Sequence, residues 1–431
     1  MKIKEQSAIR ELLSAVELPK MSTVRQNFDP AHIEDVAAYL RTKLDDEAFR
    51  RRIKPGMRVV LTGSSRQIAN ANVILRELAS FVKAQGAQPY IIPAMGSHGG
   101  ATAEGQRGIL ESFCITEDFC GCPIHSSMET KLVGHLPDGD PVYTDQFAAE
   151  ADAVIVVGRI KAHTAFRGPY ESGLIKMMAI GMGKQQGADS LHNKGFGAFA
   201  ERLPAYARVV FDNCPIVFGV GIIENAFDQT CRIEVLQRED IFDSEPALLQ
   251  YAKGRLPRLL FPEADVLVVH EIGKNFSGSG MDPNVTGTFG TPYCSGGLTK
   301  QRVVVLDLSE ESHGSFIGLG MADTTTNRAF EKCDTNAAYF NMLTSTVLKV
   351  GKIPMILEDD KMAIQAAVKT LTGVDKSRIR MIYIRNTLSL QTIMISEALL
   401  EEAGKHPCVE VLEAPRPLRF DAAGNLLDLT D

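Results

Sequence analysis

Apolar and polar positions follow two different periods in the first half of the chain. Residues 57–62 form an apolar run that predicts a buried strand, and residues 69–85 repeat apolar side chains at helical spacing as far as Gly86. Residues 89–93 predict a second strand, so this order is typical of a βαβ unit and favours a parallel sheet. Further elements are expected as strands at 153–158 and 215–223, a hairpin turn at Asp138-Gly139, and a helix that begins at Asp29-Pro30.

The same alternation returns after about residue 260. The apolar runs there predict four strands and two helices: strands at 265–270, 301–308, 353–357 and 380–385, and helices at 336–350 and 362–371. Residues 251–262, with one glycine and two prolines, are the best candidate linker. We therefore expect an α/β protein of two α/β domains with parallel-rich sheets, divided into residues 1–258 and 259–431.

Composition narrows the classes of partner. The chain has 431 residues and a net charge of −7, which disfavours nucleic acid as a partner. Its apolar runs are far shorter than the ~20 residues that cross a bilayer, and its first residues have no secretory pattern. The eight cysteines are scattered and offer no zinc-binding spacing. We expect a cytoplasmic protein with reduced thiols that acts on a small molecule.

Two predicted loops carry polar chemistry at the same sheet edge, because ligands bind beyond the carboxyl ends of parallel strands. The loop after the first strand contains Ser64, Ser65 and Arg66, whose hydroxyl and guanidinium groups suit a carboxylate or phosphate. The loop after the second strand holds His98 among glycines, which favours a site histidine over a core histidine. The alternative for the first loop is a polar turn with a solvated arginine.

A third loop, after residues 153–158, adds a lysine and two histidines. His163 comes first, and Lys176 follows within an apolar run that lowers the pKa of an amine by desolvation. His192 stands sixteen positions after Lys176. Taken singly, Lys176 fits a lysine that reaches solvent from a helix face, and His192 fits an ordinary helix histidine. Together the three loops place more reactive side chains at one edge of the sheet than a purely structural role of these residues would explain.

At these residues the chain resembles the nickel-dependent lactate racemases, a family of racemases and epimerases that act on 2-hydroxy acids with a nickel-pincer nucleotide. The resemblance runs from about Val59 to Asn193 and rests on the Ser-Ser-Arg66 turn, the Gly-Ser-His98 loop, the Lys161-Ala-His163 loop, and the spacing of Lys176 and His192. It implies two α/β domains with the active site in the cleft between them.

The resemblance also assigns roles to these residues. Lys176 would tether the cofactor, pyridinium-3,5-bisthiocarboxylic acid mononucleotide nickel, and His192 would ligate its nickel. Arg66 would hold the substrate carboxylate, while Ser64 and Ser65 would contact the cofactor. By this resemblance, inversion at C2 would proceed by reversible hydride transfer to the cofactor. His98 and His163 would then form the acid/base pair that exchanges the hydroxyl proton, because imidazoles titrate near neutral pH.

The chain departs from lactate racemase at two points. The segment between His163 and Lys176 is longer, and the chain has no tryptophan, whereas a tryptophan contacts the substrate in the lactate enzyme. We therefore expect a 2-hydroxy acid with a polar or extended tail. In the second half, Lys274 lies in a polar, glycine-rich loop after a predicted strand and is a candidate substrate ligand. The alternative there is a structural turn.

Two other classes of function are alternatives to a racemase. A non-catalytic binding or carrier protein for a nickel nucleotide or phosphorylated metabolite explains Arg66, Lys176 and His192, but it gives no reason for two further histidines. A metal-independent dehydrogenase would need a dinucleotide fingerprint, and no GxGxxG element is present. Cofactor-biosynthesis enzymes are possible partners, and the sequence does not fix the substrate or the oligomeric state.

Overall fold

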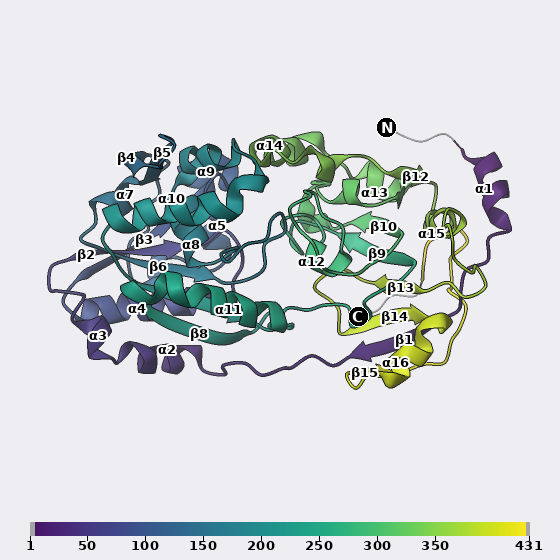
Figure 1. The fold of residues 1–431 in the computed structure, drawn as a ribbon, viewed down its shortest axis with the longest axis horizontal. Helices are drawn as coiled ribbons and strands as arrows, with labels where there is room; N and C mark the ends of the chain where they lie inside the picture. Colours follow the sequence, from purple (N-terminus) through teal and green to yellow (C-terminus); the bar gives the residue numbers. More distant parts are fainter. Residues whose placement is uncertain (1–4, 428–431) are drawn as a thin grey trace. The chain divides into compact units, whose positions relative to one another are not determined.

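The computed structural model describes residues 5–427, and the chain divides into two compact units (Figure 1). Unit 1 contains Met1–Asp29 and Pro257–Asp431, and unit 2 contains Pro30–Leu256. The sequence predicted domains of 1–258 and 259–431, so the two divisions differ at residues 1–29 and 257–258. Residues 1–29 belong to unit 1 because β1 (Met21–Gln26) pairs antiparallel with β14 (Thr392–Ser396).

Unit 2 is built on a five-stranded sheet in the order β3-β2-β6-β7-β8. All neighbouring strands are parallel except β8, which runs antiparallel to β7 at the edge. Their bounds are β2 (Arg58–Gly63), β3 (Gln88–Pro93), β6 (Ala153–Arg159), β7 (Ile216–Glu224) and β8 (Thr230–Gln237). A separate hairpin joins β4 (Thr130–His135) to β5 (Pro141–Asp145), and Gly139 at its turn has a φ of 87°.

Helices accompany this sheet in the manner of an α/β fold. They are α2 (Val36–Leu44), α3 (Glu47–Arg50), α4 (Ala71–Ala84), α5 (Ala103–Ser112), α6 (Glu117–Cys120), α7 (Gln146–Glu150), α8 (Leu174–Lys176), α9 (Lys184–His192), α10 (Phe199–Asn213) and α11 (Ile241–Arg255). A single π-helical turn over Met177–Gly181 connects α8 to α9. The sheet is buried: Val59, Leu61 and Ile155 are fully inaccessible and belong to one hydrophobic core with the inner face of α4.

Unit 1 is built on an eight-stranded mixed sheet in the order β12-β11-β10-β9-β13-β14-β1-β15. The strands from β12 to β13 are parallel, and β14, β1 and β15 join them by antiparallel pairing. The remaining bounds are β9 (Val266–Ile272), β10 (Arg302–Leu308), β11 (Thr324–Thr326), β12 (Met355–Leu357), β13 (Met381–Ile384) and β15 (Val409–Val411). The helices are α1 (Ser7–Ser14), α12 (Pro283–Thr286), α13 (Asn327–Glu331), α14 (Thr335–Ser345), α15 (Asp360–Lys369) and α16 (Leu400–Lys405).

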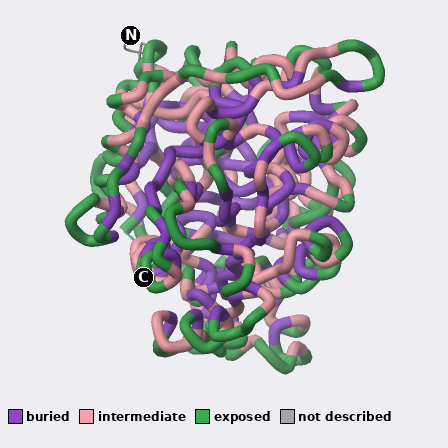
Figure 2. Tube along the Cα trace, turned by 90° about the vertical axis from the view of Figure 1, so that its left-hand side faces the viewer, coloured by how far each residue is buried: buried purple, intermediate pink, exposed green. Residues whose placement is uncertain are grey.

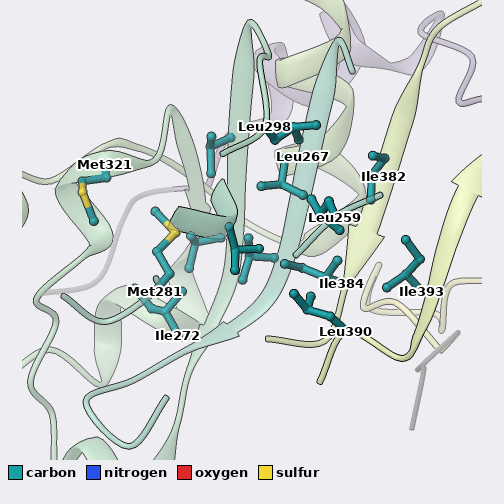
Figure 3. Close-up of a cluster of buried hydrophobic side chains, with 14 of the residues drawn as sticks. Leu259, Leu267, Ile272, Met281, Leu298, Met321, Ile382, Ile384, Leu390 and Ile393 are labelled. Carbon is teal, nitrogen blue, oxygen red and sulfur yellow. The ribbon is translucent and has the colours of Figure 1, made fainter. Parts of the chain in front are cut away.

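Two hydrophobic cores lie on the two faces of this sheet, because alternate residues of each strand point to opposite sides. Leu267 and Ile382 pack in one core with the neighbouring strands (Figure 3). Val266 and Met381 pack in the other, against α15. Figure 2 shows the trace coloured by burial, and the strands β2, β6 and β9 consist mostly of buried residues.

The predicted α/β class is confirmed, and the strands predicted at 57–62, 89–93 and 153–158 all form. The helix predicted to begin at Asp29-Pro30 is wrong. It begins at Val36, where the Asp35 carboxylate accepts a hydrogen bond from the Ala38 amide at 2.9 Å. The preceding residues are not helical, and the Ile33 amide donates to the Thr230 carbonyl at 2.8 Å. Within residues 5–427, no helix is both long and apolar enough to span a membrane.

Candidate active site

The candidate site in unit 2 lies where three parallel strands end. β3 and β6 both pair with β2 in parallel register, so the loops that follow these strands leave the sheet at one edge. These loops carry Arg66 after β2, His98 after β3, and His163 after β6. The structure therefore agrees with the expected arrangement of the three loops.

The loop after β2 presents an exposed arginine. The Ser64 hydroxyl donates to the Arg66 carbonyl oxygen at 3.3 Å and closes the turn, and Ser65 is half-buried beside it. The Arg66 charge acts on Lys176, whose pKa it helps to lower. The charge of Arg66 is therefore close enough to affect the protonation of Lys176, as expected if both residues belong to one site.

The loop after β3 is a chain of left-handed turns around His98. Gly96, Gly99 and Gly100 have φ values of 58°, 67° and 65°, which L side chains rarely adopt. The Gln106 side-chain amide donates to the carbonyl oxygens of Gly96 (2.8 Å) and His98 (3.2 Å). The Gly96 amide donates to the Gly181 carbonyl at 3.1 Å, which ties this loop to the segment between Lys176 and His192.

The loop after β6 fixes both the backbone and the ring of His163. Its amide donates to the buried Glu171 carboxylate at 2.7 Å, and its ring Nδ1 accepts from the Ala165 amide at 3.1 Å. Nδ1 therefore carries no proton, and the neutral ring holds its proton on Nε2. Burial, followed by the charges of Lys176 and His192, holds the pKa of His163 well below its usual range.

Lys176 ends the short helix α8, and a buried carboxylate caps that helix. Glu245 of α11 accepts from the amides of Leu174 (2.7 Å) and Ile175 (3.1 Å). Burial lowers the pKa of the Lys176 amine to about 8, and the charges of Arg66 and Lys161 contribute. The predicted desolvation of this lysine is thus present, and about a tenth of the amine is neutral at pH 7.

His192 ends α9 and has the opposite tautomer to His163. Its Nδ1 lies 2.7 Å from the Ala188 carbonyl oxygen, which only accepts, so Nδ1 donates and the lone pair is on Nε2. Burial lowers the pKa of His192, which keeps the ring neutral near pH 7. A backbone carbonyl that orients one ring nitrogen is the usual support for a histidine that binds metal through the other.

An aromatic cluster joins the two histidines. The Phe196 ring centroid lies 6.1 Å from that of His163 and 5.5 Å from that of His192. Phe166 packs against the His163 ring, and Phe199 packs 5.1 Å from the His192 ring. The structure therefore brings Arg66, His163, Lys176 and His192 into one region. The phenylalanine rings make this region apolar on the side of the histidines, and Arg66 and Lys176 supply positive charge.

The described side chains of this site do not form a complete set of metal ligands by themselves. In the part of the chain that the structure describes, no group of three or more His, Cys, Asp or Glu side chains is placed to hold a metal ion. At this site the hydrogen bond of the His192 Nδ1 orients the ring and leaves the lone pair of Nε2 available. The cationic side chains favour a cofactor or substrate that is anionic.

Lys274 belongs to unit 1, in the loop that follows β9. The loop is closed by the Gly273 amide, which donates to Gly280 at 2.8 Å, and by the Ser309 hydroxyl, which donates to Asn275 at 2.7 Å. Lys274 thus follows the carboxyl end of a parallel strand, as ligand loops do in such sheets. Its role toward substrate stays a prediction.

Sequence reasoning missed the buried groups that support these side chains. Glu171, Glu245 and Gln106 each have under a tenth of their surface exposed and bind backbone groups of the site loops. Their spacing carries no motif, because each lies on a separate element and meets the site only in three dimensions. The aromatic pair Phe196 and Phe199 did carry a signal, since residues three apart share a helix face.

The fold and this site define a two-unit α/β protein with a lysine and histidines at the carboxyl edge of a parallel sheet. Residues 10–200 match the lactate racemase N-terminal domain, and this stretch includes all the unit 2 candidates. The fold is similar to the lactate racemase apoprotein from Thermoanaerobacterium thermosaccharolyticum, with a TM-score of 0.52, 11% identity, and coverage of 86% of this chain and 99% of that one. No curated protein matches. The resemblance to the lactate racemase family is confirmed.

Proposed function

We propose that this protein is a racemase or epimerase that inverts the C2 centre of a 2-hydroxy acid with the help of a nickel-pincer nucleotide. The observation that carries the proposal is the pairing of Lys176 with His192. One is an amine whose pKa is about 8, and the other is a neutral imidazole whose Nδ1 is engaged by a carbonyl. These are the forms that covalent attachment and metal ligation require.

The residues present fit such a cofactor. Lys176 would hold it covalently, the Nε2 of His192 would ligate its nickel, and Ser64 and Ser65 would contact its polar groups. When bound, the nickel-pincer nucleotide supplies a hydride acceptor, a function that no side chain of the chain provides.

The protein's own residues bind the substrate and move its proton. Arg66 pairs with the carboxylate, which fixes C2 relative to Lys176 and His192. His98 and His163 serve the hydroxyl proton from the two faces. The Nε2 of His163 carries the ring proton, so His163 can accept the hydroxyl proton at Nε2 only after the ring proton has moved to Nδ1 and the hydrogen bond from the Ala165 amide has broken.

A carrier protein is the second candidate. It is favoured by the cationic surroundings of Lys176, which alone would retain an anionic nucleotide. It requires no proton transfer, so it predicts that substitution of His98 has no effect on the bound cofactor or on any reaction.

The test is expression with and without the enzymes that make the pincer cofactor. With them, we expect a mass increment, stoichiometric nickel and racemisation of a 2-hydroxy acid, and without them a folded but inactive protein. Lys176→Ala should remove the mass increment, and His192→Ala should remove the nickel. Lys194→Ala and His135→Ala, both exposed positions of unit 2, are the matched controls.

Three outcomes decide between the candidates. Full activity of the protein made without the cofactor enzymes would falsify the assignment. Loading without any racemisation supports the carrier. A mass increment that survives Lys176→Ala places the covalent bond elsewhere.

A further inference from the structure

A fully buried lysine lies between the site elements. Lys184 begins α9 and has no exposed side-chain surface. Its φ is +54°, in the left-handed region that residues other than glycine rarely adopt. Such strain persists only where the surrounding structure determines the conformation, and it concentrates at functional sites.

The Lys184 ammonium group has three partners from three separate elements. It forms an ion pair with Asp145 at 3.0 Å, donates to the Gln106 side-chain oxygen at 3.1 Å, and donates to the Pro93 carbonyl. Asp145 in turn caps α7 through the Phe147 amide at 2.8 Å. The buried ammonium group thus has one ion-pair partner and two hydrogen-bond acceptors.

Gln106 carries this connection on to the His98 loop. While its side-chain oxygen accepts from Lys184, its side-chain nitrogen donates to the carbonyls of Gly96 and His98. Lys184 lies on the same segment of the chain as Lys176 and His192, eight positions after the first and eight before the second. Hydrogen bonds from the His98 carbonyl through Gln106 to Lys184 therefore connect the His98 loop to the segment that carries Lys176 and His192.

We propose that Lys184 and Gln106 are positioning residues that hold the His98 loop in a fixed position relative to Lys176 and His192. The proposal rests on the proposed function in treating these three as one site, although its first test is independent of activity. Fold stability alone does not account for the arrangement. A buried ion pair is often no more stabilising than apolar packing of the same volume, and here it adds a strained backbone.

The first experiment is hydrogen exchange of the full chain, followed by mass spectrometry. Gln106→Leu should raise the exchange rate of the amides at residues 96–101 by about tenfold, because the loop loses both side-chain restraints. The matched control is Gln26→Leu in β1. Gln26 is equally buried, and its side-chain nitrogen likewise donates to two backbone carbonyls, those of Arg258 and Leu390. Its exchange effects should stay around β1 and β14.

A second variant covers the case in which Gln106→Leu does not fold. Lys184→Met combined with Asp145→Asn removes the ammonium group without leaving a charge buried and unpaired, and the substituted amide side chain retains an oxygen to cap α7. It should raise exchange over residues 96–101 in the same way. Unchanged exchange there in either folded variant, or an equal rise in the Gln26→Leu control, overturns the proposal.

Kinetics of the loaded enzyme give the second readout. Per folded and loaded molecule, Gln106→Leu should lower kcat about tenfold and change KM less, since Arg66 lies on a different loop. A purely structural role would lower only the folded fraction. If the wild-type protein racemises nothing, the proposed function fails, and the exchange experiment still decides whether the loop is held by Gln106 and Lys184.

Discussion

At the scale of single residues, the environment of Lys176 sets when its amine reacts. Because burial and nearby cations lower the pKa of this amine to about 8, its neutral fraction rises as pH increases through 8, well below an ordinary lysine. We expect acylation of Lys176 in the cofactor-free protein, followed by peptide mass spectrometry, to show a midpoint near pH 8. Lys194, which is exposed, is the control. A midpoint above pH 10 at Lys176 contradicts the prediction.

His98 and His163 give a second prediction at this scale. Each alanine variant should lower turnover by ~10²-fold or more while the protein stays folded, because each removes a proton transfer. The two losses should differ between enantiomers, since the proposed function assigns the two histidines to opposite faces of the substrate. Turnover is measured in both directions by chiral chromatography, with circular dichroism to check folding. A variant with near-normal rates both ways identifies its histidine as structural.

The desolvation of Lys176 was predictable from sequence, and the protonation of the histidine rings was not. Lysine desolvation followed from the apolar run around Lys176. The tautomers of His163 and His192 depend instead on the Ala165 amide and the Ala188 carbonyl, whose directions exist only in the folded backbone. Hydrogen bonds to backbone groups leave no mark on residue spacing.

At the scale of elements, the cap on α8 makes stability depend on pH. Burial raises the pKa of Glu245 to about 7 from an ordinary value of 4.5, and its Oε1 has no hydrogen-bond partner among residues 5–427. Between these values the unfolded chain releases the proton and the folded protein keeps it. Stability therefore falls as pH rises through this window, by about 1.4 kcal/mol per pH unit for this group.

Glu245→Gln tests this dependence. The variant keeps an oxygen for the amides of Leu174 and Ile175, so relative to wild type it should gain unfolding free energy as pH rises from 5 to 7. Urea unfolding at several pH values measures the difference. Asp243→Asn replaces an exposed carboxyl on the same helix and is the control. A constant difference between wild type and Glu245→Gln would show that the carboxyl does not titrate in this range.

Elements with a continuous apolar run were predictable, whereas elements that depend on a distant partner were not. The runs of β2, β3 and β6 are buried on both faces and need no partner to be recognised. Sequence analysis did not find β1, β14 or β15, which alternate or are short, and which meet only in the folded sheet. The same cause misplaced residues 1–29 in the first domain.

At the scale of the whole molecule, the substrate is the open question, and we predict a tail that is polar or extended. In the proposed function Arg66 binds the carboxylate that all 2-hydroxy acids share, so selection between these acids would depend on other positions. Candidates are Lys274 in unit 1 and the long segment around Arg167 and Tyr170 in unit 2. A site that hydrogen-bonds a tail penalises an analogue without it by about 1–3 kcal/mol per unpaired group.

A panel of single enantiomers tests this prediction on the loaded enzyme. Sugar acids and hydroxy diacids should be inverted faster than lactate, and Lys274→Ala should reduce that preference more than it reduces lactate turnover. The control is Lys352→Ala, an exposed lysine of unit 1. If lactate is inverted faster than every other substrate of the panel, the prediction is wrong.

The strand β1 has a consequence for how the chain is made. Residues 21–26 leave the ribosome early, yet their partner β14 lies about 370 residues later, and β15 later still. Unit 2 is one continuous segment and is complete long before that. The first strand must therefore wait unpaired through most of translation, with its backbone groups open to pairing with other chains. The eight-stranded sheet can therefore be completed only after β14 and β15 have been synthesised.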